Sequence, residues 1–178
     1  IIKISELDEK SVEYHKEIID LFCLSKEVIN RLRSEINKKN ITVNLLGETA
    51  LVYGVKKIID EIIYNLCDNA VKYNKENGMI NITTCTDKNK VKITVEDTGI
   101  GIPLSHQKRV FERFFRVDKS RSRKTGGTGL GLAIVKHIAE VHHADISLDS
   151  DEGIGTTIRV AFADNTMVIP TVQTAQPQ

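Results

Sequence analysis

The sequence has little of what marks several common classes of protein. Its 178 residues include only three cysteines, and Cys23, Cys67 and Cys85 form neither a CxxC pair nor an even set. We therefore expect reduced thiols in a cytosolic protein rather than a disulfide framework. No apolar run approaches the ~18 residues of a membrane span, and no signal peptide opens the chain. Because the first residue is Ile rather than Met, we expect a longer parent protein, which can itself be membrane-bound.

Net charge is also nearly absent. The chain carries 25 Lys and Arg against 24 Asp and Glu, which gives +1 at pH 7. This balance excludes a global nucleic-acid footprint, which requires a basic surface. What the chain does have is apolar content: 40% of its residues are hydrophobic. That is enough for one packed core, and we find no internal repeat.

Apolar periodicity predicts interleaved helices and strands. An apolar stripe of Val28, Ile29, Leu32 and Ile36 predicts a helix that ends near residue 40. Asp20 or Ser25 is its predicted cap. Further helices are predicted at about residues 55–73 and 129–142. Strands are predicted at residues 13–22, 41–46, 79–87, 90–97, 144–150 and 156–163, with 79–87 and 90–97 forming a hairpin. This mixed order favours an α+β fold with helices on a mostly antiparallel sheet.

The predicted helix at residues 55–73 carries the first chemical signal. At about 100° per residue one arc is apolar and consists of Ile59, Ile63, Leu66, Cys67 and Ala70. Asn65, Asn69 and Lys72 lie on the opposite side. An Asn carbonyl can ligate a hard cation, and a lysine one turn on can contact phosphate. The alternative is the solvated polar face that any amphipathic helix has.

A second signal is the stretch VEDTGIGIP, in which a predicted strand ends at Asp97. Glycines let the backbone approach a flat ligand, and an ionised carboxylate only accepts hydrogen bonds, which suits the exocyclic amine of adenine. Ile100 and Ile102 would supply apolar walls. The alternative is an ordinary turn, because turns are rich in Asp and Gly.

Residues 98–128 lose regular periodicity, and loops of this length are usually functional or disordered. Within them, residues 108–124 hold eight Lys and Arg against two acids, together with Phe111, Phe114 and Phe115. Phenylalanines favour burial and argue against simple disorder. Because the rest of the chain is neutral, a lid over polyphosphate fits this segment better than a nucleic-acid site. A solvated stretch is the remaining alternative.

The segment TGGTGLGLAIV, residues 125–135, places four glycines at a predicted helix start. Amides at a helix N-terminus bind phosphate. The segment is not a Walker loop, because no GK[ST] follows the glycines. It is not the dinucleotide fingerprint either, because its spacing is G-x-x-G-x-G and no βαβ unit surrounds it. Spacing alone leaves a hinge and a phosphate cradle open.

Taken together and in order, four stretches resemble the ATP-binding catalytic domain of bacterial sensor histidine kinases: NLCDNAVKY, DTGIGIP, FERFFRVDKSRSRKTGGTGLGLAIVKHIAE and GIGTTIRV. This fold is shared with gyrase-type ATPases, mismatch-repair ATPases and certain chaperones. The likeness covers residues 14–163 and implies a two-layer sandwich of a mixed five-stranded sheet and three helices. Residues 1–13 resemble the end of a dimerisation helix, and residues 164–178 are expected to be disordered. FFRVDKSRSRKTGGTGLGL resembles the phosphate-regulon type of sensor kinase.

The resemblance implies where ATP and Mg²⁺ bind. Asn69 would ligate Mg²⁺, with Asn65 supporting it. Lys72 would contact phosphate, Tyr73 the nucleoside and Asp97 the adenine amine. Three further groups are implied: a base pocket of Gly99, Gly101, Ile102, Gly153, Gly155 and Thr156; a phosphate cradle of Gly127, Gly129, Leu130 and Gly131; and Arg113 and Arg116, near the phosphates, in a lid of residues 98–128.

The resemblance also separates a kinase from a hydrolase. Hydrolases of this fold, and the serine kinases that regulate sigma factors, carry a Glu base where this chain has Asn65. Asn65 cannot take a proton, and Glu61 one turn earlier is a weaker candidate. Transfer of the ATP γ-phosphoryl group to histidine is therefore favoured over hydrolysis and over a serine kinase. The intact asparagines, Asp97 and the glycines argue against a degenerate module that binds only partners.

The acceptor histidine is expected elsewhere. In the family it lies on a helix, followed by an acid and then a Pro, and that context is absent at His15, His106, His137, His142 and His143. The chain alone should therefore bind Mg²⁺-ATP without autophosphorylating. The implied partners are an upstream dimerisation and phosphotransfer domain and a response regulator, without nucleic acid. The parent protein is expected to be a homodimer anchored in the bacterial membrane, with this domain in the cytoplasm.

Overall fold

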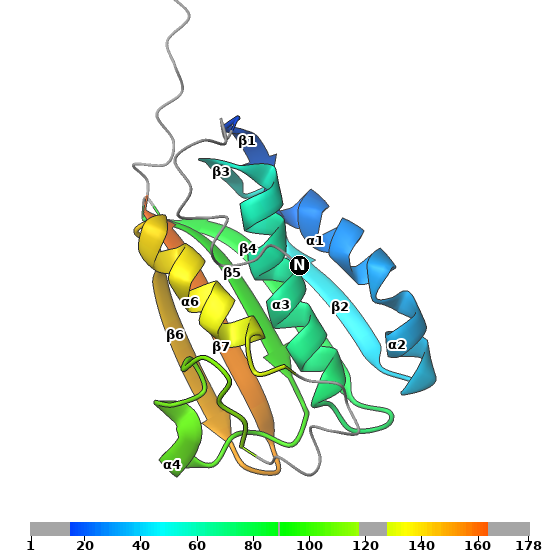
Figure 1. Cartoon of the computed structure of the whole chain (residues 1–178). Helices are drawn as coiled ribbons and strands as arrows, with labels where there is room; N and C mark the ends of the chain where they lie inside the picture. The colour runs from blue at the N-terminus through cyan, green and yellow to red at the C-terminus, as the bar shows by residue number, and fades with distance from the viewer. Residues whose placement is uncertain (1–14, 89, 118–127, 164–178) are drawn as a thin grey trace, which may run out of the picture.

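The computed structural model describes residues 15–88, 90–117 and 128–163. In these ranges a layer of helices lies against one face of a five-stranded sheet (Figure 1). Three predicted segments lie outside the described residues: the dimerisation-helix end at 1–13, the tail at 164–178 and the lid residues 118–127.

The five-stranded sheet has the order β2-β4-β5-β7-β6. Its strands are β2 (Thr42–Gly47), β4 (Met79–Asp87), β5 (Lys90–Asp97), β6 (Asp145–Asp151) and β7 (Gly155–Ala163). β2 pairs in parallel with β4, and the other three pairings are antiparallel. In β4 and β5 buried residues alternate with more exposed ones, because one face packs on the helices and the other is open. The predicted mixed five-stranded sheet and its hairpin are confirmed.

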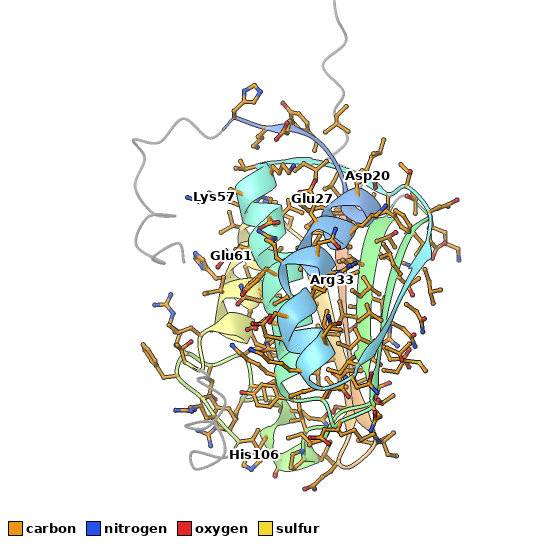
Figure 2. The ribbon with its side chains drawn as sticks, turned by 90° about the vertical axis from the view of Figure 1, so that its right-hand side faces the viewer. Asp20, Glu27, Arg33, Lys57, Glu61 and His106 are labelled. Atoms are coloured by element: carbon orange, nitrogen blue, oxygen red, sulfur yellow. The ribbon has the colours of Figure 1, made fainter. Side chains whose placement is uncertain are left out.

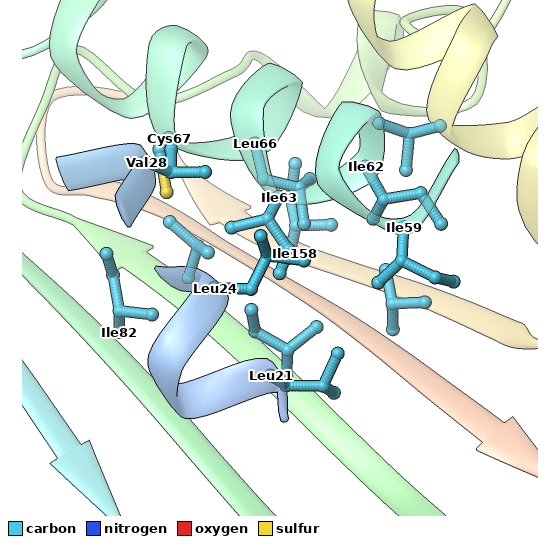
Figure 3. Packing of buried hydrophobic residues seen from close by; sticks show 14 of the residues in the cluster. Leu21, Leu24, Val28, Ile59, Ile62, Ile63, Leu66, Cys67, Ile82 and Ile158 are labelled. Atoms are coloured by element: carbon cyan, nitrogen blue, oxygen red, sulfur yellow. The ribbon is translucent and has the colours of Figure 1, made fainter. Parts of the chain in front are cut away.

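The helical layer consists of α1 (Leu21–Arg31), α3 (Lys56–Lys72) and α6 (Gly131–Val141). The short α2 (Arg33–Lys38) follows α1, and the four-residue α4 (Leu104–Gln107) lies near the lower end (Figure 1). In the core, isoleucines of α3 face leucines of α1 and residues of the sheet (Figure 3). The whole predicted arc of α3 is buried: Ile59, Ile63, Leu66, Cys67 and Ala70. Within the described ranges, no helix has the length and apolar character that a membrane crossing needs.

The predicted strand at residues 13–22 is wrong at its C-terminal end. Among the described residues it is limited to β1 (Glu17–Asp20), and α1 begins immediately afterwards. Asp20 ends the strand because it caps the helix: its Oδ1 accepts a hydrogen bond from the Phe22 N–H at 2.9 Å. Ser25 is not the cap, since its hydroxyl donates to the Leu21 carbonyl inside α1.

The N-terminal third contains one further wrong prediction and one strand that was not predicted. The helix expected to reach residue 40 is interrupted at Leu32, whose φ of −90° and ψ of 4° lie in the bridge region between helix and strand. The strand β3 (Leu51–Gly54) was not predicted; it pairs with β1 in a separate two-stranded sheet. Four residues are too few for a period-two pattern to stand out.

Several segment ends meet at one end of the molecule. α3 ends there at Lys72, and β5 ends at Asp97, which pairs with Thr156 near the start of β7. α6 begins at Gly131 against α3, close to Asn65. The stretches that carried chemical signals in the sequence are thus brought together by the fold.

Candidate functional site

A cavity of about 560 Å³ opens where these segment ends meet. The second half of α3 forms one side, residues 99–103, Val110 and residues 115–117 form another, and the starts of α6 and β7 complete it. Its apolar lining residues include Ala70, Val95, Leu132 and Ile158. Small-molecule sites have volumes in this range and combine apolar walls with a few polar groups.

The polar face predicted for α3 lies along this cavity. Asn65, Asn69, Lys72 and Tyr73 are all part of the lining. Packing explains their direction, because burial of the apolar arc against α1 and the sheet turns the polar residues toward the cavity.

Asn65 and Asn69 face a space kept open by a glycine. The Nδ2 of Asn65 donates to the Glu61 carbonyl oxygen at 2.7 Å, which leaves Oδ1 for a ligand. A β-carbon on Gly131 would lie 3.0 Å from that oxygen and 3.5 Å from Nδ2 of Asn69. The Asn65 oxygen beside this space fits a hard cation such as Mg²⁺, and Asn69 presents its amide group to the same space.

Lys72 is paired within the cavity wall. Its Nζ lies 2.6 Å from Oδ2 of Asp68, one turn earlier on α3, and both residues belong to the lining. The two side chains keep 33% and 18% exposure. A partly exposed ion pair of this kind contributes little energy, so the ammonium group remains available to an anionic ligand.

Asp97 ends β5 at the cavity and lines it together with Gly99, Gly101, Ile102 and Thr156. Burial raises the pKa of its carboxyl group from 3.8 to about 6, against hydrogen bonds from the backbones of Gly99 and Thr156 that lower it. The Gly99 N–H donates to Oδ1 at 2.8 Å. At neutral pH the carboxyl group is mostly ionised, so it accepts hydrogen bonds and suits an amine donor.

The basic segment brings one of its two predicted arginines to the cavity. Arg116 lines it, and the Nε of this residue is buried without a hydrogen-bond partner among the described residues. A buried donor without a partner costs free energy, so an anionic group in the cavity would satisfy it. Arg113 is exposed and is not part of the lining.

The three phenylalanines of this segment do not share one environment. Phe111 and Phe115 are half-buried, and Phe115 packs against His106 and Arg109. Phe114, in contrast, is 71% exposed, so its expected burial was wrong. Its backbone has a φ of 63°, and its N–H donates to the Gly129 carbonyl, which holds the side chain outward.

The predicted cradle is partly assembled in the described residues. Gly129 and Gly131 line the cavity, whereas Leu130 packs against the hydrophobic core. Gly127 lies outside the described residues. At the opposite rim, Gly153 lines the cavity with Thr156, while Gly155 is buried outside the lining.

A polar link at the part of the cavity lined by Gly101 and Ile102 was not predicted from the sequence. Ser150 is buried at the end of β6, and its Oγ accepts a hydrogen bond from the Ile102 N–H at 2.9 Å. Gln107 adds a second link, because its Nε2 donates to the carbonyl oxygens of Ser150 and Ile102. A signal was present: Ser150 stands in phase with the apolar residues of β6, and a polar residue in a buried phase marks a hydrogen bond.

Groups considered for other chemistry lie away from the cavity. Glu61, the weaker base candidate, is not part of the lining, and it lies well above His106 along the molecule (Figure 2). All five histidines fall within the described residues, and none lines the cavity. The cavity therefore contains no histidine to accept a phosphoryl group.

Known proteins share this sequence pattern. Residues 54–166 match the family described as histidine kinase-, DNA gyrase B- and HSP90-like ATPases. Sensor-like histidine kinase SenX3 from Mycolicibacterium smegmatis is 36% identical over 165 residues, which cover 92% of this chain and 43% of that protein. Sensor histidine kinase WalK from Bacillus subtilis is 36% identical over 161 residues, which cover 89% of this chain and 26% of that protein. The chain thus spans less than half the length of these relatives.

A solved structure shares the fold. The catalytic domain of histidine kinase ThkA matches with a TM-score of 0.73 and 27% identity, over 84% of this chain and 96% of that one. The sequence match, the shared fold and the residues around the cavity agree. The chain belongs to the family of histidine kinase-, DNA gyrase B- and HSP90-like ATPases and is homologous to the catalytic domains of sensor histidine kinases.

Proposed function

We propose that this chain binds ATP in the cavity and that its parent protein transfers the γ-phosphoryl group to a histidine on a helical domain outside this chain. The proposal rests on where the charged and amide groups lie around the cavity. The carboxylate of Asp97 lies on β5, whereas the amides of Asn65 and Asn69 and the ammonium of Lys72 lie along α3. This arrangement suits a ligand with an amine on its base and a polyphosphate chain.

The chemistry of the lining residues supports a separate role for each of them in binding ATP. Asp97 accepts a hydrogen bond from the adenine amine, and Tyr73 contacts the nucleoside. Lys72 and Arg116 bind phosphate oxygens and neutralise charge as the γ-phosphoryl group leaves ADP. Asn69, supported by Asn65, holds Mg²⁺, which when bound supplies further charge neutralisation at the phosphates.

Transfer to histidine is favoured over hydrolysis by the residue at position 65. Water needs a general base to become a nucleophile, and the resemblance places that base where Asn65 stands. The Asn65 amide cannot take a proton, and the Glu61 side chain does not line the cavity. A neutral imidazole already carries a nucleophilic lone pair and needs no base from this domain.

The parent protein's partners belong to the same proposal. The acceptor histidine lies on a dimerisation domain, and a response regulator takes the phosphoryl group afterwards. The parent is a homodimer anchored in a membrane, and this domain works on the cytoplasmic side. The relatives' names, sensor histidine kinases, and the short share of their length that this chain spans support this proposal. The phosphate-regulon subtype stays a prediction, because none of these names states a stimulus.

Incubation with ATP labelled at its γ-phosphate tests the proposal. The chain alone should acquire no label, whereas a phosphoacceptor domain supplied in trans should become labelled on histidine, in a bond that is stable to alkali and lost in acid. Fast release of inorganic phosphate without transfer would instead favour an ATP hydrolase. Label on a serine would favour a serine kinase of the same fold, and phosphohistidine on the isolated chain would contradict the missing acceptor.

A further inference from the structure

The C-terminal end of α3 is held by a lysine from another part of the chain. Lys39, the residue after α2, donates from Nζ to the carbonyl oxygens of Val71 (2.8 Å), Lys72 (2.6 Å) and Asn74 (3.1 Å). The last carbonyls of a helix have no partner inside the helix, and a cation there also interacts favourably with the helix dipole. One ammonium group thus satisfies three acceptors at this helix end.

A fourth carbonyl at the same end connects to the loop that follows Asp97. The Tyr73 carbonyl accepts a hydrogen bond from the Ile100 N–H at 3.0 Å. The backbone at Gly99 passes so close that a β-carbon there would overlap the same carbonyl oxygen. The position of residues 97–102 therefore depends on where the final turn of α3 lies.

Asn74 extends the connection to the other side of the loop. It is 6% exposed, and its Nδ2 donates to the Met79 carbonyl at 3.1 Å. Thr98, which directly follows Asp97, donates from its N–H to the same carbonyl at 3.1 Å and accepts from the Met79 N–H at 2.9 Å. Lys39 is thus connected to Thr98 through the backbone carbonyl and side-chain amide of Asn74 and the carbonyl of Met79.

We propose that Lys39 is a positioning residue of the nucleotide site. Lys39 does not line the cavity. It fixes the final turn of α3, which carries Lys72 and Tyr73, relative to the loop after Asp97. A ligand that contacts both segments requires a constant spacing between them. The identity of that ligand rests on the proposed function, whereas the coupling between the two segments does not.

Four variants separate positioning from general stability. Lys39→Met removes the ammonium group and keeps an unbranched apolar side chain, and Lys39→Arg returns a cation that can donate to several carbonyls. Lys38→Met removes the same charge from the neighbouring, exposed lysine. Phe162→Leu loosens the core near the opposite end of β5 and β7, where Phe162 pairs with Val91.

Two measurements on the whole chain test the proposal: hydrogen exchange at the Ile100 amide without nucleotide, and calorimetric titration with Mg²⁺-ATP. In Lys39→Met the Ile100 amide should exchange about tenfold faster relative to core amides of the same variant. Affinity for Mg²⁺-ATP should fall about tenfold. Lys39→Arg should recover most of both losses, and Lys38→Met and Phe162→Leu should keep wild-type affinity while folded.

A folded Lys39→Met protein with wild-type exchange at Ile100 and wild-type affinity would overturn the proposal, as would failure of Lys39→Arg to recover either property. If Lys39→Met does not fold, Lys39→Gln replaces it, because its side-chain amide group can still donate. This variant should show smaller changes in exchange at Ile100 and in affinity. If it shows neither change, the proposal is overturned. A wild-type chain that fails to bind Mg²⁺-ATP contradicts the proposed function instead, and exchange at Ile100 still decides the role of Lys39.

Discussion

Among single residues, Asp97 carries a cost in stability, because burial disfavours its charged form. The free protein keeps a carboxylate where burial disfavours its charge, although the Gly99 N–H donates to it. An adenine amine would add a hydrogen bond to the charged form. Asp97 is therefore expected to destabilise the empty protein and to favour the bound one.

Asp97→Asn should stabilise the nucleotide-free protein at neutral pH. The folded-state pKa of about 6 lies above 3.8, so the folded protein binds this proton more tightly than the unfolded chain. Wild-type stability consequently falls as pH rises from about 4 to 6 and stays reduced above that range. Thermal unfolding at pH 7.5 should show the variant melting a few degrees higher, with the difference shrinking near pH 4. A variant that melts lower than wild type at pH 7.5 would contradict this account of the carboxylate.

Gly101 and Gly153 form a matched pair for testing how the loop after Asp97 packs against the turn between β6 and β7. Both have a positive φ, of 66° and 82°. A β-carbon on Gly101 would overlap the Asp151 carbonyl oxygen, whereas a β-carbon on Gly153 meets nothing within 4 Å. Gly153→Ala should cost about 1–2 kcal/mol of unfolding free energy through backbone strain alone.

Gly101→Ala should cost more than Gly153→Ala, because the clash adds to the strain and pushes the loop away from the turn between β6 and β7. Chemical denaturation of both variants measures the difference. Equal losses of stability would show that the loop does not press against Asp151 as described.

Among the elements, α3 was the most completely predictable from sequence. It is long and strongly amphipathic, so the predicted 55–73 differs from the observed Lys56–Lys72 by one residue at each end. Residues whose secondary structure depends on contacts with distant parts of the chain were less predictable. The interruption at Leu32 follows no breaker in the sequence, and β3 exists through its pairing with β1. The local sequence pattern predicts an element when that element is long enough to show several repeats of its apolar periodicity.

At the element scale, the amides on α3 lead us to expect that ATP affinity depends on Mg²⁺. Asn69→Ala removes an amide that faces the space beside Gly131, so ATP affinity should lose about tenfold in the presence of Mg²⁺. In EDTA, variant and wild type should bind ATP equally, because the amide acts through the cation. Asn37→Ala, an exposed site on α2, serves as the control. A loss of affinity that is the same with and without Mg²⁺ would instead indicate direct contact between Asn69 and ATP.

For the whole molecule, the site depends on segments that are far apart in the chain. The motifs could be read from sequence because each is a local stretch, and the fold places Asn65, Asp97 and Gly131 around one cavity. Which arginine of the basic segment reaches that cavity could not be read, because Arg113 and Arg116 lie in a stretch without helical or strand periodicity. The phase of Ser150 in β6 signalled a buried hydrogen bond, but its partner, the Ile102 N–H, could not be read because it lies 48 residues away in the chain.

The central claim is that one cavity binds both ends of ATP, the base through Asp97 and the metal-bound phosphates through α3. Calorimetric titration of Mg²⁺-ATP into wild type, Asp97→Asn and Asn69→Ala at pH 7.5 tests it most directly. We expect one site in the wild-type chain, with affinity reduced by about tenfold or more in each variant. Wild-type affinity in both variants would contradict it.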